Sequence, residues 1–206
     1  MFTPTLTGMG ERAHLAQMEI NLDTHIQDVV NVIIYENLTD VILCGHSYGG
    51  MVITGVAGEI PHRLTSLFYL DAFVPSSGES FFDVVSPEVI QSFLSLAGQH
   101  KGQVPPIPAS AFNVNANDAA WVDATCVPQS LASFAQAVRK GVEAVEVTRR
   151  TYVFATANGM ETFRPIFDRL RDDSRWKVLT VACGHDVMLD APEELATMLL
   201  AETTCA

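Results

Sequence analysis

The chain has 206 residues, of which 48% are hydrophobic and 17% are charged, and its formal net charge is −12. This length and composition are typical of one globular domain with a sizeable core. The negative charge repels nucleic-acid phosphates and anionic lipid, so neither nucleic acid nor a membrane surface is an expected partner. No stretch has the roughly 18 apolar residues that are needed to cross a bilayer.

The N-terminal residues and the cysteines indicate a cytoplasmic protein. Residues 1–5 lack the basic segment and apolar run of a signal peptide. The four cysteines, Cys44, Cys126, Cys183 and Cys205, are far apart and lack the close spacing of a zinc site. Cys44 and Cys183 fall in apolar runs, where a reduced cysteine packs as a small hydrophobe. We therefore expect core thiols rather than disulfides, in a reducing compartment.

Apolar periodicity predicts alternating strands and helices along most of the chain. In chain order it predicts a strand at 2–6, a helix at 25–37, a strand at 41–44, a helix at 51–60 and a strand at 67–70. After a long irregular segment it predicts a strand at 152–155, a helix at 163–171, a strand at 177–182 and a helix at 192–201. Asp23 or Thr24 is the expected cap of the first helix. This alternation predicts an α/β fold with a mainly parallel sheet and helices on both faces.

The segment 75–147 does not continue this alternation of strands and helices. A proline-rich turn at 105–108 separates helix-like pieces at 87–97 and 128–138. We expect this segment to form a helical cap over the carboxyl edge of the sheet. Residues 1–206 would then form a single domain that carries the cap as an insertion.

The sequence Gly45-His46-Ser47-Tyr48-Gly49 has the G-x-S-x-G pattern of a nucleophile elbow. It follows an apolar strand without a gap and opens a helix, which is the context that the motif requires. The turn is tight, so the glycines that flank Ser47 are expected to leave room for it. We predict that Ser47 is a nucleophile and that the backbone N–H of Tyr48 stabilises an oxyanion.

A serine nucleophile needs a base, and His185 is the candidate. It follows the last predicted strand, which is the third place in the chain order serine, acid, histidine. His46 lies inside the elbow and is expected to point away from this base in a structural role. The other histidines are expected at the solvated surface: His14, His25, His62 and His100.

The acid has two candidates. It must lie at the carboxyl edge of a strand to orient the histidine. In the loop after the strand at 152–155, Asn158 stands at the expected position, and Glu161 is displaced along the loop. Asp71 ends the apolar strand at 67–70, and a buried carboxylate without a partner is costly. The sequence favours Asp71, with Glu161 or the lack of a functional acid as alternatives.

These motifs resemble bacterial α/β-hydrolases of the esterase group that is related to plant methyl-salicylate esterases and hydroxynitrile lyases. The matching stretches are 2–8, 22–26, 45–50, 69–75, 184–189 and 191–195. The resemblance covers nearly the whole chain, most weakly in the cap. It implies ester hydrolysis without a metal or an organic cofactor.

Two comparisons within this superfamily sharpen the roles. Some haloalkane dehalogenases are similar in carrying the catalytic carboxylate in a tyrosine-x-acid-alanine context, which residues 69–72 match in support of Asp71. Because Ser47 replaces their aspartate nucleophile, dehalogenation is not expected. Related hydroxynitrile lyases place a lysine after the catalytic histidine. Here Asp186 follows His185, which favours an esterase.

One part of the family pattern is missing, so we expect an N-terminally incomplete version of the fold. Members begin with a strand and a His-Gly loop that supplies the second oxyanion N–H. This chain starts at the next strand, residues 2–6. The loss would expose strand edges and remove about 3–4 kcal/mol of transition-state stabilisation. Truncation, a second chain that fills the gap as in a homodimer, and a different second donor are the alternatives.

The sequence therefore predicts a serine carboxylesterase that acts on a small hydrophobic or aromatic ester. Tyr48 and Trp121 are the predicted substrate contacts, and the apolar pocket is expected to include Phe112, Phe134 and Val138 of the cap. The alternative is a non-catalytic member of the fold that binds a small apolar ligand and lacks activity because the oxyanion loop is missing.

Overall fold

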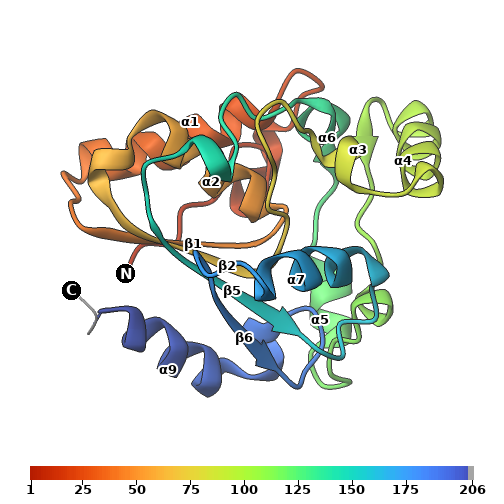
Figure 1. The fold of residues 1–206 in the computed structure, drawn as a ribbon. Coiled ribbons are helices and arrows are strands. Elements are labelled where there is room, and N and C mark those ends of the chain that lie inside the picture. Colours follow the sequence, from red (N-terminus) through yellow and green to blue (C-terminus); the bar gives the residue numbers. More distant parts are fainter. Residues whose placement is uncertain (204–206) are drawn as a thin grey trace.

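A four-stranded parallel sheet lies at the centre of the structure, a computed structural model that describes residues 1–203 (Figure 1). Its order is β1-β2-β5-β6. The strands are β1 (Val41–Ser47), β2 (Leu64–Ala72), β5 (Arg149–Ala155) and β6 (Lys177–Val181). All neighbouring pairs are parallel, so the carboxyl ends of the strands meet at one edge of the sheet.

Helices cover both faces of this sheet, as the alternation of elements predicts. They are α1 (Leu22–Tyr35), α2 (Gly49–Glu59), α7 (Arg164–Arg171) and α9 (Pro192–Thr203), with the short α8 (Val187–Asp190). Tyr69 and Tyr152 point into the larger core, to which α1, α2 and α7 contribute. Phe68 and Val153 point to the opposite face, where α9 packs. The period of two along each strand thus divides the apolar side chains between two cores, and the α/β-hydrolase fold class is confirmed.

The first helix and the N-terminal segment differ from the sequence prediction. α1 begins at Leu22, and its cap is Asn21 rather than Asp23 or Thr24. Asn21 Oδ1 accepts the N–H of Thr24, and Thr24 Oγ1 accepts that of Asn21. Residues 2–6 do not form the predicted strand.

Side chains bind the backbone of this N-terminal segment in place of a strand ladder. The Thr5 carbonyl accepts a hydrogen bond from Arg12 Nη1 at 2.8 Å, and the Thr7 N–H donates to Asp28 Oδ2 at 2.6 Å. A 3₁₀ turn, η1 (Gly10–Leu15), follows the segment.

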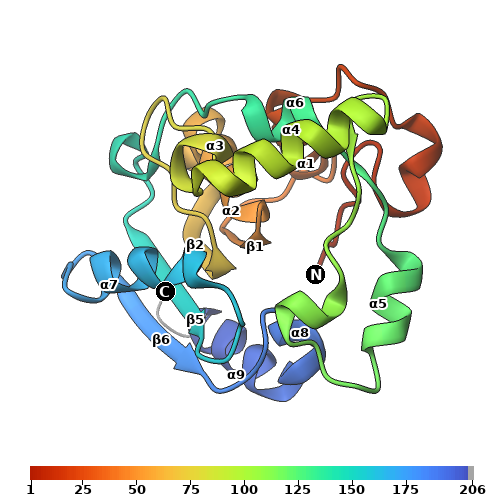
Figure 2. The same cartoon turned by 90° about the vertical axis from the view of Figure 1, so that its right-hand side faces the viewer.

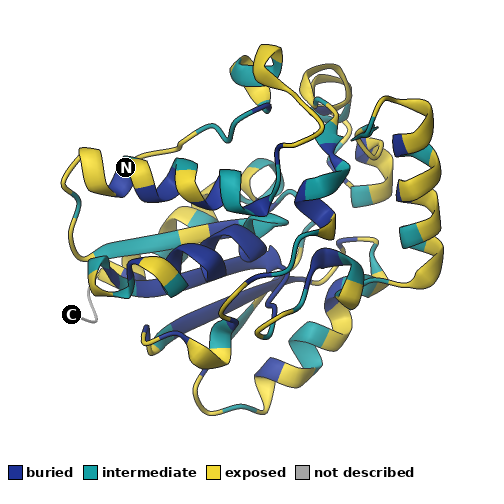
Figure 3. Cartoon of the chain, turned by 90° about the horizontal axis from the view of Figure 1, so that it is seen from above, coloured by how far each residue is buried: buried dark blue, intermediate teal, exposed yellow. Residues whose placement is uncertain are grey.

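β1 lies at the edge of the described sheet, next to β2. Its first three residues are half-buried and Cys44 is exposed, whereas nearly all of β2 is buried (Figure 3). The predictions of a strand covered on both faces and of Cys44 as a core thiol are therefore wrong. Cys126 and Cys183 are free thiols, and Cys183 is half-buried. Cys205 lies outside the described residues.

The segment 75–147 packs beyond the carboxyl ends of the strands (Figure 2). Its helices are α3 (Phe81–Val84), α4 (Pro87–Gln99), α5 (Ala119–Thr125) and α6 (Leu131–Ala135). Its strands β3 (Gln103–Val104) and β4 (Gln129–Ser130) form an antiparallel pair. The predicted helix at 87–97 is confirmed by α4. The predicted helix at 128–138 is wrong, because β4 occupies its start and α6 has only five residues.

Short 3₁₀ turns complete the chain. They are η2 (Pro61–Arg63), η3 (Ala109–Phe112), η4 (Val142–Ala144) and η5 (Glu161–Phe163). None of the helices in residues 1–203 combines the length and apolarity that a membrane-crossing helix needs.

Glu202 fastens the last helix to the sheet at the edge that carries the amino ends of the strands. Its carboxylate accepts hydrogen bonds from Ser66 Oγ at 3.2 Å, Thr151 Oγ1 at 2.8 Å and Lys177 Nζ at 3.1 Å. Arg149 donates to its backbone carbonyl and lies 3.4 Å from its carboxylate. Burial raises the pKa of Glu202, but these donors together lower it below its ordinary value. The carboxylate therefore stays charged and links α9 to three strands.

Candidate active site

The turn between β1 and α2 presents Ser47 in a strained conformation. Ser47 has a φ of 53°, which is rare for a residue with a side chain. A Cβ atom on Gly45 would lie 2.5 Å from the Gly49 carbonyl oxygen, and one on Gly50 would lie 2.0 Å from that of Phe73. A Cβ on Gly49 would meet nothing within 4 Å. The prediction that the glycines flanking Ser47 leave room for a tight turn is therefore confirmed at Gly45 and wrong at Gly49. On the helix side of the turn the crowded position is Gly50.

At this turn the backbone N–H of Tyr48 is available for a ligand, whereas its side chain packs inside the protein. Its N–H has no hydrogen-bond partner among residues 1–203, so it is free to bind an oxyanion. Its ring packs edge-on against Phe134, 5.5 Å between centroids, and burial raises its pKa. Its hydroxyl group lies 3.0 Å from His25 Nδ1. The half-buried side chain of Tyr48 thus packs against the core, so the predicted substrate contact of Tyr48 is left to its backbone N–H.

His25 anchors this tyrosine, although the sequence predicted a solvated histidine. It is 1% exposed, and its Nε2 lies 3.2 Å from the Thr7 carbonyl oxygen. Because a carbonyl oxygen only accepts, Nε2 carries the proton, and Nδ1 accepts the hydrogen bond of the Tyr48 hydroxyl. Burial lowers the pKa of His25, so the ring stays neutral. The elbow is thereby tied to α1 and to the N-terminal segment.

Asp71 and His185 form a buried pair at the carboxyl edge of the sheet. His185 Nδ1 donates to Asp71 Oδ2 at 2.7 Å, and the two residues are 2% and 0% exposed. Asp71 lies inside β2 rather than after it, with a φ of 41°. Glu161, the other acid candidate, is exposed in η5. The structure therefore brings Asp71, and not Glu161, to His185.

The backbone places Ser47 beside this pair. The Phe73 N–H donates to the Ser47 carbonyl at 3.1 Å, and Ser47 pairs with Ala72, the neighbour of Asp71. Because Nδ1 of His185 binds Asp71, Nε2 is the nitrogen left for a serine hydroxyl. The ends of β1 and β2 and the loop after β6 thus bring a serine, a carboxylate and an imidazole to one edge of the sheet.

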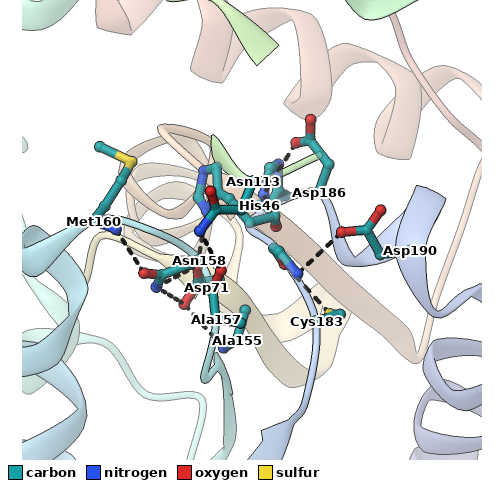
Figure 4. Close-up of polar contacts among 12 residues, drawn as sticks. His46, Asp71, Asn113, Ala155, Ala157, Asn158, Met160, Cys183, Asp186 and Asp190 are labelled. Carbon is teal, nitrogen blue, oxygen red and sulfur yellow. Dashed lines mark hydrogen bonds and ion pairs between the residues drawn. The ribbon is translucent and has the colours of Figure 1, made fainter. Parts of the chain in front are cut away.

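His46 contacts His185, so the prediction that it points away is wrong. The two rings are 4.3 Å apart between centroids, and His46 Nε2 lies 3.0 Å from the His185 carbonyl oxygen. Burial and the neighbouring His185 lower the pKa of His46 to about 3, so its ring is neutral and donates this hydrogen bond. Asp186 Oδ1 lies 3.9 Å from the same nitrogen, and burial raises the pKa of Asp186 (Figure 4).

Two phenylalanines enclose the His185 ring. Phe163 stacks on it at 4.9 Å between centroids and an interplanar angle of 19°, and Phe112 lies at 5.1 Å. The Phe112 carbonyl also accepts the backbone N–H of His185 at 2.9 Å. The sequence placed Phe112 in a cap pocket and did not single out Phe163, since ring contacts between distant segments leave no local pattern.

Trp121 does not reach this cluster. It lies on α5 and is 59% exposed, and no contact joins it to Ser47, Asp71 or His185 within residues 1–203. Phe134 is buried with the aromatic residues of α3 and α4. The predicted substrate contact of Trp121 is therefore not supported by its position, and Phe134 belongs to the core of the cap.

Comparisons with known proteins show the family of this chain. Residues 1–198 match the model of the family described as "Alpha/beta hydrolase family". A carbendazim hydrolyzing esterase of Nocardioides sp. (strain SG-4G) is 44% identical over 211 residues, which cover 98% of this chain and 87% of that protein.

Solved structures share the fold. An extracellular alpha/beta-hydrolase from a Paenibacillus species, described as a structural and functional homologue of tobacco salicylic acid binding protein 2, has a TM-score of 0.76 at 20% identity, with 97% of this chain and 86% of that chain covered. The methylesterase MES16 from Arabidopsis has a TM-score of 0.71 at 18% identity, with 98% and 85% covered. The 44% identity to the Nocardioides esterase points to an esterase-like hydrolase, and the match over residues 1–198 shows that the chain belongs to the alpha/beta hydrolase family.

Proposed function

We propose that this protein is a serine carboxylesterase that hydrolyses small hydrophobic or aromatic esters through an acyl-enzyme. The observation that carries the proposal is the buried pair of His185 and Asp71, joined at 2.7 Å beside the strained turn of Ser47. The relative that is 44% identical is itself described as an esterase.

In the proposed mechanism, His185 Nε2 removes the proton of Ser47 as Oγ attacks the ester carbonyl carbon. Asp71 holds the imidazole in place and stabilises the imidazolium that forms. The free N–H of Tyr48 binds the oxyanion of the tetrahedral intermediate. His185 then protonates the leaving alkoxide, so that an alcohol departs and an acyl-Ser47 ester remains.

Water completes the cycle. His185 accepts a proton from a water molecule, whose oxygen attacks the acyl carbon. The second tetrahedral intermediate collapses, the acid departs, and the proton on His185 returns to Ser47. The reaction consumes one ester and one water and yields one acid and one alcohol.

The surroundings of the base support an apolar substrate. The half-buried ring of Phe112 lies against His185 and can contact a group bound beside it, while the buried ring of Phe163 stacks on the imidazole. An apolar site strengthens the electrostatic interactions of the reaction and favours a hydrophobic or aromatic ester over a charged one.

Labelling with a fluorophosphonate probe tests the proposal. The wild type should form a covalent adduct on the peptide that contains Ser47, and Ser47→Ala should form none. Ser77→Ala, which changes an exposed serine, is the matched control and should label like the wild type. A folded wild type that neither labels nor hydrolyses p-nitrophenyl esters would overturn the proposal and favour a non-catalytic, ligand-binding member of the fold.

A further inference from the structure

The Asp71 carboxylate has more partners than a catalytic acid needs to contact its histidine. Besides His185, the backbone N–H of Ala155 donates to Oδ1 at 3.1 Å. The side-chain amide of Asn158 donates to both oxygens, at 3.2 Å to Oδ1 and 2.9 Å to Oδ2 (Figure 4). Asp71 is fully buried, and a buried carboxylate needs such donors to offset the loss of water. Together with His185, Asn158 and Ala155 supply that compensation.

The orientation of the Asn158 amide is determined by its neighbours. The Met160 N–H donates to Asn158 Oδ1 at 2.9 Å, so this atom is the amide oxygen. The Asp71 oxygens only accept, so Nδ2 must face them. The side chain is 5% exposed, and its backbone N–H donates to the Ala155 carbonyl at 3.3 Å. A buried amide held at its oxygen, its backbone and its nitrogen is a rigid support for the carboxylate.

We propose that Asn158 is a positioning residue, which fixes the Asp71 carboxylate in the orientation in which Oδ2 meets His185 Nδ1. This inference rests on the proposed esterase function. Asn158 acts through Asp71 and does not touch the substrate. Its amide is the neutral counterpart of the carboxylate that the sequence pattern led us to expect at this position.

The geometry also allows position 158 to carry the carboxylate in place of position 71. Asparagine and aspartate have the same shape, so Asn158→Asp can accept the Met160 N–H and face residue 71 in place of the amide. Combined with Asp71→Asn, this change exchanges the carboxylate and the amide across the hydrogen bond. The negative charge then lies one hydrogen bond further from His185 than in the wild type, and residue 71 connects the two.

The exchange provides the test. Asp71→Asn alone should lower kcat by orders of magnitude. Asp71→Asn/Asn158→Asp should recover at least about tenfold over Asp71→Asn, because residues that act as a unit are not additive. The control is Asp71→Asn/Asn113→Asp, which adds a carboxylate to an exposed asparagine that binds the same loop at the Ala157 carbonyl. This control should recover nothing.

A single variant separates positioning from a merely structural role. Asn158→Ala should lower kcat about tenfold or more and leave KM within about twofold, because the lost hydrogen bonds act on the transition state rather than on binding. The downfield ¹H NMR resonance of the His185 Nδ1 proton should broaden or shift in Asn158→Ala. Asn113→Gly, which removes an amide at a left-handed residue without strain, should leave this resonance unchanged.

The outcomes are distinguishable. An unchanged kcat and Nδ1 resonance in Asn158→Ala would overturn the inference, as would a double exchange that is no faster than Asp71→Asn. A wild type that fails to label with the fluorophosphonate would contradict the proposed function instead. In that case the NMR comparison still decides whether Asn158 positions Asp71.

Discussion

The side chain of His46 donates a hydrogen bond from Nε2 to the backbone carbonyl of His185 at 3.0 Å, so two histidines from distant parts of the chain pack together in the site. Because its neutral form makes this bond, His46 links stability to pH. In the unfolded chain a histidine has a pKa of about 6.5. In the folded protein burial and His185 lower the pKa of His46 to about 3.

Between these two pKa values the unfolded chain binds a proton that the folded protein excludes. The stabilisation is therefore complete above pH 6.5 and is lost as the pH falls toward 3. His46→Gln keeps a donor near the position of Nε2 but cannot titrate. As the pH falls from 7.5 to 5, the free energy of unfolding of His46→Gln should rise by about 2 kcal/mol relative to that of the wild type. Denaturant unfolding at the two pH values measures this difference. Parallel stability curves for the two proteins would contradict this prediction.

The acid is tested by exchanging each candidate carboxylate for an amide. Asp71→Asn should reduce kcat by about 10³–10⁴-fold, because the amide cannot stabilise the imidazolium of His185. Glu161→Gln should leave kcat within about twofold, since Glu161 is exposed and has no contact with His185. Steady-state hydrolysis of a p-nitrophenyl ester measures both. The reverse pattern would move the acid to the loop after β5.

The glycines after Ser47 should differ sharply in tolerance. In Gly50→Ala the new Cβ would lie 2.0 Å from the Phe73 carbonyl oxygen, so the elbow must shift and stability should fall by about 3 kcal/mol or more. In Gly49→Ala the Cβ meets nothing within 4 Å, and alanine favours α2. The Gly49→Ala variant should therefore equal or exceed the wild type in Tm. Equal losses in the two variants would show that the crowding does not determine their effect.

The contacts of Glu202 that hold α9 on the sheet give a prediction about stability that is separate from the chemistry. Glu202→Gln removes the charge that faces Lys177 and Arg149 and replaces one of the two acceptor oxygens with a donor, so the free energy of unfolding should fall by about 2–3 kcal/mol. Glu194→Gln changes an exposed residue of the same helix and should stay within about 0.5 kcal/mol. Denaturant titration compares them. Similar effects of the two changes would show that the contacts of Glu202 do not stabilise the fold.

The central strands and most of the long helices could be predicted because their signals are local. Apolar runs indicate β2, β5 and β6, of which β2 and β5 are the interior strands of the sheet. Asp71 lies at the end of β2, and His185 follows β6. The cap was harder to predict. Residues 128–138 have helical spacing, but Gln129 and Ser130 pair with β3, and the Leu131 N–H donates to the Gly102 carbonyl. Pairing between distant segments overrides the local preference there.

The same limit applies to the site. Ser47 and Asp71 lie at strand ends and His185 follows a strand, in a motif or in a fixed chain order, so each could be proposed from the sequence. The contacts of His46, His25 and Asn158 join segments that are far apart in the chain. No spacing rule reports such contacts. The sequence therefore identified the chemical groups but not the side chains that orient them.

The hydrogen bond from the His185 N–H to the Phe112 carbonyl joins the cap directly to the backbone of the proposed base. Grafting a foreign cap onto this sheet to change specificity would therefore replace the residues that hold the proposed base as well as those that line the pocket. A chimaera that retains the backbone path through residues 112–113 keeps that support. The boundary for such grafts is thus set by where the base is held, and not by where the strands end.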